Sequence, residues 1–149
     1  MVWGAFSALG CLELQFTTTR MNSQEYIDVL QKSLVPFLKR NRQKKIVFQQ
    51  DNARIHVSRE TMDWFSSNKI NVMDWPACSP DLNPIENLWG IMVRRVYANN
   101  RHFETTDELK AAIIETWNSI DGALFQSLAE SMNNRIFEVI RKGGKQLGK

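Results

Sequence analysis

The stretch WPACSPDLNPIENLW, from Trp75 to Trp89, decides how the middle of this chain folds. Three of the chain's four prolines lie in it, at positions 76, 80 and 84. Proline has no backbone N–H to donate, so it ends strands but is tolerated at the first position of a helix. We therefore predict a strand that ends at Trp75, an extended loop, and a helix that begins at Pro84. Glu86 then lies in the first turn of that helix.

The helix after the prolines is strongly indicated. Asn83 stands at the expected N-cap, directly before Pro84. The apolar residues that follow recur at helical spacing, which predicts one buried stripe. They are Ile85, Leu88, Trp89, Met92, Val93 and Val96.

The rest of the chain alternates strand and helix signals. Two short strands separated at Gly10 are expected first, then a helix with a capping box formed by Asn22 and Glu25. Pro36 is expected to kink or shorten that helix. The runs KIVFQQD and INVMDW predict strands on either side of a helix capped by Ser58. Later helices are expected after Thr105 and over residues 123–141. The element order predicts an α/β fold, with a mixed sheet flanked by helices.

Length and composition restrict the class of protein. A chain of 149 residues with 43% apolar side chains predicts one globular domain, residues 1–149. A net charge of +3 permits an anionic partner but is only a weak signal. The apolar N-terminal run is broken by Glu13, well short of the ~20 residues of a membrane helix, so no membrane association is expected.

Asp51 and Glu86 are the acids that we single out. Asp51 follows a predicted buried strand, and carboxyl ends of strands in α/β sheets are where sites gather. Between the two acids lie 34 residues, enough for a helix, a strand and a return to a neighbouring sheet position. Carboxylates without a His/Cys cluster suit a hard cation such as Mg²⁺ or Mn²⁺. Two acids are too few to balance two divalent ions.

Each acid also has a simpler interpretation. An acid in the first turn of a helix, like Glu86, is favoured by the helix dipole by about 0.3–1 kcal/mol without any function. Asp51 beside Asn52 is equally compatible with a turn. His56 is more commonly a hydrogen-bonded loop histidine than a metal ligand.

The motifs QQDNARIHVS and VMDWPACSPDLNPIENLWGIMVRRV closely resemble the catalytic domain of Tc/mariner transposases. Further similar segments, from MVWGAFS to the terminal RKGG, extend the resemblance over almost the whole chain. It implies a ribonuclease H-like fold, binding of DNA (transposon ends and target), DNA cleavage and strand transfer with Mg²⁺ or Mn²⁺, and action in the nucleus. A homodimer is compatible with it.

The resemblance also implies residue roles. Asp51 and Glu86 match the second and third acids of the Asp-Asp-Glu triad, as catalytic metal ligands. Asn52, His56 and Asn87 match residues that would support them. Arg54 stands where the family commonly has proline, and it could contact a DNA phosphate or perturb the loop. We consider Arg54, Arg94 and Arg95 as DNA contacts.

The first triad Asp has no counterpart here by motif, because the family carries it upstream of the segment that matches MVWG. The helix-turn-helix modules that recognise DNA are not matched either. We therefore expect a partial catalytic domain without its first strand or strands, inactive alone. The alternative is a non-catalytic remnant that binds DNA or protein through the basic run Lys39 to Lys45, with Arg94, Arg95 and Arg101.

Overall fold

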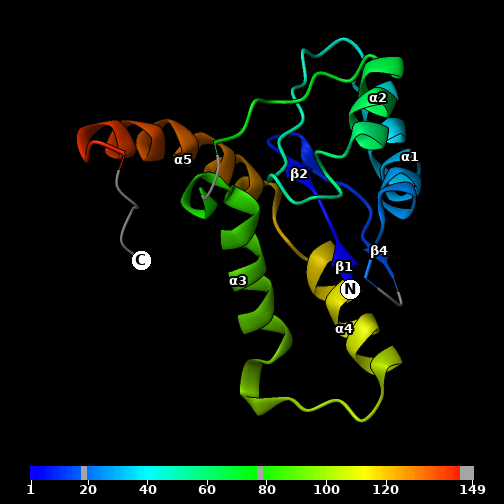
Figure 1. Cartoon of the computed structure of the whole chain (residues 1–149). Coiled ribbons are helices and arrows are strands. Elements are labelled where there is room, and N and C mark those ends of the chain that lie inside the picture. Colours follow the sequence, from blue (N-terminus) through cyan, green and yellow to red (C-terminus); the bar gives the residue numbers. More distant parts are fainter. Residues whose placement is uncertain (18–19, 77–78, 145–149) are drawn as a thin grey trace. The chain divides into compact units, whose positions relative to one another are not determined.

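The computed structural model describes residues 1–17, 20–76 and 79–144 (Figure 1). They form two compact units, each of which is described here by itself. Unit 1 consists of Met1–Ala5 and Leu12–Ser79, and unit 2 consists of Phe6–Cys11 and Pro80–Lys149. Both units combine a pair of very short strands with helices. The single domain expected for residues 1–149 stays a prediction.

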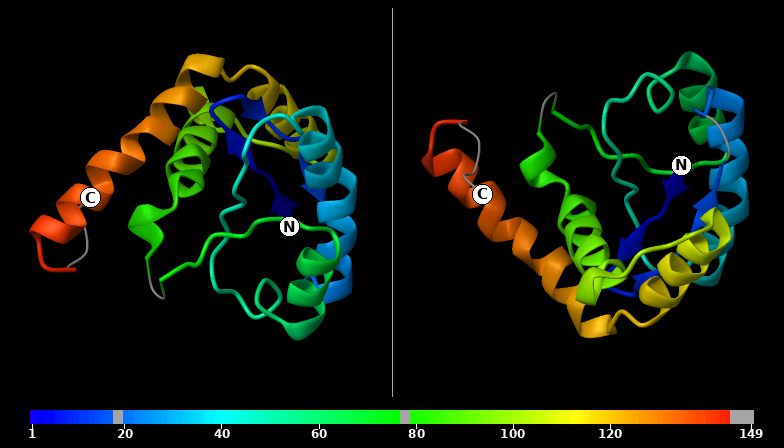
Figure 2. Two further views of the ribbon diagram at one scale, coloured as in Figure 1. Left: turned by 90° about the horizontal axis from the view of Figure 1, so that it is seen from above. Right: turned by 90° about the horizontal axis from the view of Figure 1, so that it is seen from below.

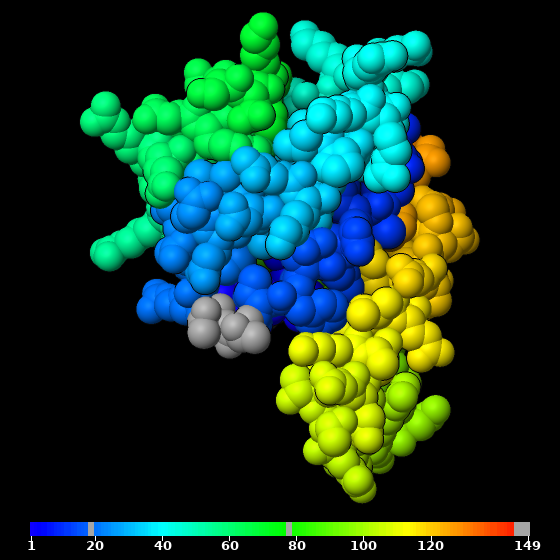
Figure 3. Space-filling model, turned by 90° about the vertical axis from the view of Figure 1, so that its right-hand side faces the viewer, coloured from blue at the N-terminus to red at the C-terminus, as the bar shows by residue number. Residues whose placement is uncertain are grey.

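Unit 1 contains two strands and two helices. β1 (Val2–Trp3) pairs antiparallel with β4 (Gln15–Phe16). α1 (Ser23–Arg40) and α2 (Arg59–Ser67) lie side by side in both views of Figure 2, and Figure 3 shows their side chains in contact.

The two strands predicted on either side of α2 are much shorter than expected. They meet only in a parallel bridge between Phe48 and Val72. The amide of Phe48 donates to the carbonyl of Asn71, and the amide of Met73 donates to the carbonyl of Phe48, both at 2.8 Å. An apolar run shows that a segment is buried but not how many of its residues pair, because pairing depends on the neighbouring chain.

α1 confirms the predicted capping box. The Asn22 side chain accepts from the Glu25 amide, and the Glu25 carboxylate accepts from the Asn22 amide. Pro36, expected to kink or shorten the helix, lies inside it, and α1 continues to Arg40. Pro36 and Lys32, whose carbonyl loses its donor, are both on the exposed side of α1, where the carbonyl is accessible to solvent.

The buried face of α1 organises the core of unit 1. Tyr26 and Leu30 are 1% and 0% exposed. This core combines residues from α1, α2, the Phe48 segment and the stretch before β4. Its members are Leu12, Tyr26, Leu30, Leu34, Phe37, Phe48 and Phe65.

Unit 2 begins with the hairpin of β2 (Phe6–Ser7) and β3 (Gly10–Cys11). Gly10 has φ +125°, a conformation that other residues rarely adopt. After the 3₁₀ turn η1 (Pro80–Leu82) come α3 (Pro84–Val96), the turn η2 (Ala98–Asn100), α4 (Thr106–Asn118) and α5 (Gly122–Arg141). The helix predicted to begin at Pro84 is confirmed at that residue.

Aromatic side chains join the elements of unit 2. Trp117 of α4 is 2% exposed, stacks on Trp89 of α3 at 5.6 Å between ring centroids, and packs against Phe125 of α5 at 6.3 Å. Phe125 also contacts Phe6 of the hairpin at 5.5 Å. This confirms that Trp89 lies on the packed side of α3, as its place in the apolar stripe predicts.

The last predicted helix is also confirmed. α5 ends at Arg141, and Gly143 and Gly144 follow with φ +64° and +82°. Such left-handed glycines are common helix stops. No helix in the described part of the chain is long and apolar enough to span a membrane.

Candidate functional site

Asp51 is held in a fixed turn just after the Phe48 bridge. Its Oδ1 accepts hydrogen bonds from the amide of Ala53 at 3.0 Å and lies 2.6 Å from Nδ1 of His56. The side chain of Asp51 is 55% exposed, whereas that of His56 is 18% exposed. No hydrogen bond to Asp51 Oδ2 occurs among the described residues, so one carboxylate oxygen is anchored and the other has no described partner.

Two consecutive hydrogen bonds, from Tyr26 to Gln50 and from Gln50 to His56, orient His56. The Tyr26 hydroxyl donates to Gln50 Oε1 at 2.7 Å, and Gln50 Nε2 donates to the carbonyl of His56 at 3.0 Å. The His56 ring packs on the ring of Tyr26, with centroids 4.4 Å apart. Tyr26 and Gln50 thereby set the position of His56, whose side chain holds Asp51.

Tyr26 remains a neutral donor in this chain. Burial raises the pKa of its hydroxyl well above the ordinary value, and the nearby charge of Asp51 raises it further. A neutral tyrosine keeps its proton for Gln50, which in turn keeps the Gln50 amide directed toward His56.

Asn52 has a different contact from the one expected. Its Nδ2 donates to the carbonyl of Trp75 at 2.9 Å, which ties the Asp51 turn to the start of the proline-rich loop. Asn52 therefore holds the loop and makes no described contact with the Asp51 carboxylate. Arg54 is exposed and is part of no ion pair among the described residues.

Glu86 is placed by the start of α3 alone. Its amide donates to the carbonyl of Asn83 at 3.1 Å, and its side chain is exposed. In the described part of the chain the carboxylate has no hydrogen-bond or ion-pair partner. Asn83 occupies the N-cap position as predicted, but its side chain makes no capping bond.

Asn87, beside Glu86, is anchored from α5. Its Oδ1 accepts from Arg135 Nη1 at 2.6 Å, and the same nitrogen donates to the carbonyl of Asp81 at 3.2 Å. Arg135 thus connects η1, the start of α3 and α5. Arg94 and Arg95 are exposed in the last turn of α3, where cations are favoured by the helix dipole.

The structure groups the sequence-predicted residues by unit. Asp51, Asn52 and His56 lie together in unit 1, and Glu86 and Asn87 lie together in unit 2. Among the residues that the structure describes, no group of three or more His, Cys, Asp or Glu side chains is arranged to hold a metal.

Sequence reasoning missed three residues that position this site. Neither Tyr26 nor Arg135 stands out in the sequence as a residue of the site. Gln50 carried a usable signal, because a polar side chain at the end of an apolar run is rarely buried without a partner. It is 8% exposed and fully engaged.

Comparison with known proteins identifies the family. The family model described as DDE superfamily endonuclease matches residues 1–110. The Tc3 transposase of Caenorhabditis elegans is 50% identical over 147 residues, which cover 99% of this chain and 45% of the relative. The Tc1 transposase of the same organism is 31% identical over 144 residues, which cover 97% of this chain and 52% of the relative. The chain spans about half the length of the curated relatives that it matches.

Solved structures agree on the fold. The Mos1 transposase paired-end complex with left transposon end matches with a TM-score of 0.86 at 22% identity, covering 99% of this chain and 44% of that chain. The Mos1 catalytic domain with Raltegravir and Mg matches with a TM-score of 0.79 at 21% identity, covering 99% and 83%. The expected α/β, ribonuclease H-like fold is confirmed. On its sequence, this chain belongs to the DDE endonuclease superfamily, as a catalytic-domain sequence of the Tc/mariner transposases.

Proposed function

We propose that this chain is catalytic-domain sequence of a DNA transposase that cuts and joins DNA by metal-dependent phosphoryl transfer. Family membership supports the reaction class, and the Asp51 turn is the structural observation that carries it. An acid with one oxygen anchored by Ala53 and His56, and with a second oxygen that has no described partner, suits a metal ligand better than a turn residue. A turn needs only the Ala53 contact.

We propose Mg²⁺ or Mn²⁺ as the metal, with Asp51 and Glu86 among its ligands. Both side chains are exposed carboxylates with oxygen atoms available, the donors that hard cations prefer. The Mos1 catalytic-domain relatives are described with Mn and with Mg. When bound, such ions supply an activated water and stabilise charge on the phosphate.

The chain's own residues would prepare the site before any metal binds. His56 holds the Asp51 carboxylate in one orientation, and Tyr26 with Gln50 holds His56. In unit 2, Arg135 fixes Asn87 beside Glu86. Supporting contacts of this kind orient metal ligands and raise metal affinity.

The substrate that we propose is DNA, as transposon ends and target, with action in the nucleus. The Mos1 relative is described as a paired-end complex with a transposon end, and we include a homodimer in the proposal on that basis. We propose Arg54, Arg94 and Arg95 as DNA contacts, since all three are exposed cations.

Metal binding tests the ligand assignment directly. We expect Mn²⁺ binding, followed by calorimetry or by Mn²⁺-induced proton relaxation, to weaken in both Asp51→Asn and Glu86→Gln. Glu60→Gln is the matched control for Glu86, because Glu60 also lies in the first turn of a helix and is exposed. Equal Mn²⁺ affinity for Glu60→Gln and Glu86→Gln would remove Glu86 from the ligand set.

We expect the 149-residue chain by itself to cleave DNA weakly or not at all, because two carboxylates balance only half the charge of two divalent ions. Efficient Mn²⁺-dependent cleavage by the purified chain, abolished in Asp51→Ala, would overturn this expectation while supporting the role of Asp51.

A further inference from the structure

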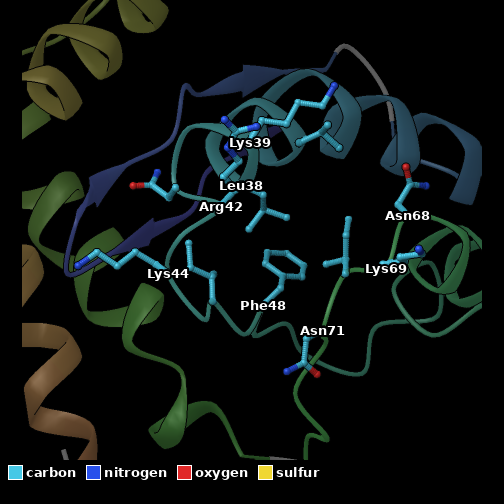
Figure 4. A pocket seen from close by; sticks show the side chains of 12 residues that line it. Leu38, Lys39, Arg42, Lys44, Phe48, Asn68, Lys69 and Asn71 are labelled. Carbon is cyan, nitrogen blue, oxygen red and sulfur yellow. The ribbon is translucent and has the colours of Figure 1, made fainter.

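Unit 1 contains a pocket that the proposed catalytic residues do not line (Figure 4). Its volume is about 350 Å³, and it lies where α1 ends and where the chain leaves α2. It is on the amino-terminal side of the Phe48–Val72 bridge, whereas Asp51 follows Phe48 on the carboxyl-terminal side. Parallel strands carry their sites at the carboxyl end, so this pocket is a second location in the same unit.

Four cations and no acids line the pocket. Three of the cations, Lys39, Arg42 and Lys44, come from the basic run after α1, and the fourth, Lys69, comes from the turn after α2. None of the four forms an ion pair within the described part of the chain. A run of charged residues usually forms only a solvated surface. Here Lys69, which is 25 residues beyond Lys44 in the sequence, joins the run, so the four cations surround a pocket.

The floor of the pocket is apolar. Phe48 lies in its middle in Figure 4, with Lys44 and Lys69 on opposite sides. The other apolar residues that line the pocket are Val35, Leu38, Ile46 and Ile70. A ligand that contacted only the rim cations would leave the apolar floor exposed to water, and burial of that surface would contribute nothing to binding. A ligand that fits the whole pocket therefore has both negative charge and a flat or apolar part.

The backbone at Lys69 is a second, independent observation. Lys69 has φ +53° at the position after the C-cap of α2. Its amide donates to the carbonyl of Ser66 and the next amide, of Ile70, donates to that of Phe65, both at 3.0 Å, which is a Schellman motif. Glycine or asparagine is usual here, because other side chains are strained in the left-handed region. A lysine that keeps this conformation suggests that its cation is needed at the rim.

We propose that this pocket binds single-stranded DNA, with phosphates on the cationic rim and an unstacked base over the apolar floor. A positively charged groove with surfaces for base stacking is the usual design of sequence-independent single-strand sites. Duplex DNA keeps its bases paired and would meet only the rim. The inference rests on the proposed function, since cutting and joining DNA produces free strand ends.

The test uses the full chain and a fluorescent oligothymidylate of about 12 nucleotides, within the usual range of single-strand sites. Fluorescence anisotropy gives the affinity over a salt series. Lys69→Gly should weaken binding and reduce the slope of log K against log salt by about 0.7, the value for one lost single-strand phosphate contact. Thermal unfolding should show Lys69→Gly to be at least as stable as the parent chain, since glycine relieves the strained φ. Lys44→Gln should also weaken binding.

Lys32→Gln is the matched control, because Lys32 is exposed on α1 and does not line the pocket. Its affinity should equal that of the parent chain. Equal losses in Lys32→Gln and Lys69→Gly would overturn the proposal, as would tighter binding of a duplex of the same length. Displacement of the oligonucleotide by polyglutamate at lower charge concentration would assign the pocket to an acidic protein segment instead.

The two proposals fail separately. Asp51→Asn should weaken Mn²⁺ binding and leave oligothymidylate binding, measured without metal, unchanged. Mn²⁺ binding without oligonucleotide binding would reject the pocket alone, and the reverse result would reject the metal site alone.

Discussion

Asp51 in unit 1 and Glu86 in unit 2 are positioned in opposite ways. Asp51 depends on a chain of contacts from Tyr26, Gln50 and His56, which come from α1, the bridge segment and the following turn. The Glu86 carboxylate has no described partner, and its place follows from the start of α3, which Pro84 begins and which Arg135 contacts through Asn87. Within one chain, a carboxylate can therefore be positioned either by tertiary contacts to its side chain or by the place of its residue in a helix.

The two carboxylates therefore differ in the conformational freedom of their side chains. Asp51 has one oxygen held by both Ala53 and His56, so its side chain has few conformations available. Glu86 has a fixed backbone but a long, exposed side chain that keeps its rotamer freedom. Disturbing the core of unit 1 should affect Asp51, whereas disturbing the core of unit 2 should affect only where α3 begins.

The largest expected effect comes from removing the aromatic anchors of the two units. Tyr26→Ala and Trp117→Ala should each lower the free energy of unfolding by about 3–5 kcal/mol, because both side chains are almost fully buried. Urea denaturation measures this loss. The NMR signal of the His56 ring should shift in Tyr26→Ala and stay in place in Trp117→Ala. A shift of the His56 signal of equal size in both variants would contradict the conclusion that Asp51 and Glu86 are positioned independently.

Tyr26→Phe isolates the hydroxyl. It leaves Gln50 Oε1 buried without its donor and should cost about 1–3 kcal/mol at neutral pH. Because folding raises the pKa of Tyr26 above its ordinary value of 10.0, the parent chain should lose stability as pH rises beyond that value. Tyr26→Phe should lack this loss. Denaturation midpoints between neutral and strongly alkaline pH test it, and parallel profiles for both chains would be the contrary result.

Lys69→Gly changes the strained turn after α2 without touching either acid. We expect it to stabilise unit 1 by about 1 kcal/mol, since a left-handed conformation costs a lysine roughly 1–2 kcal/mol and glycine loses part of this gain to entropy. The thermal midpoint should rise. Asn68→Gly, one residue earlier and with φ −90°, is the control that should not gain stability.

The smallest expected change in stability comes from the N-cap residues of α2 and α3, Ser58 and Asn83. Ser58→Ala removes a side chain that accepts from the Thr61 amide and should cost about 1 kcal/mol. Asn83→Ala should cost only a few tenths, because the Asn83 side chain makes no capping bond and Pro84 already begins the helix. Chemical denaturation of the two variants gives the comparison. An equal cost would mean that Asn83 contributes to α3 in solution.

Local rules were sufficient for much of this chain. The capping box at Asn22, the start of α3 at Pro84 and the glycine stop after Arg141 all follow from residues within a few positions of one another. The resemblance of the central motifs also predicted the family and the fold correctly. These features share a cause, because each depends on short-range backbone chemistry or on a contiguous motif.

Other features were not predictable from local patterns. The strands around α2 shrink to the Phe48–Val72 bridge, and α1 continues past Pro36. The length of a strand depends on its partner, and the cost of a proline depends on whether the freed carbonyl faces water. Asn52 contacts the carbonyl of Trp75, 23 residues away. Nothing near Asn52 in the sequence indicates that partner.

By itself, the sequence determined that an acid begins α3 and that another follows an apolar run, because proline, caps and hydrophobic spacing act over a few residues. Only the tertiary structure decided how Asp51 is held: Tyr26 and Gln50 position His56, and His56 contacts Asp51. It also decided that Lys69 joins the basic run on one rim. Hydrogen bonds and charges act through space, so residues distant in the chain become partners only once the core of unit 1 has packed.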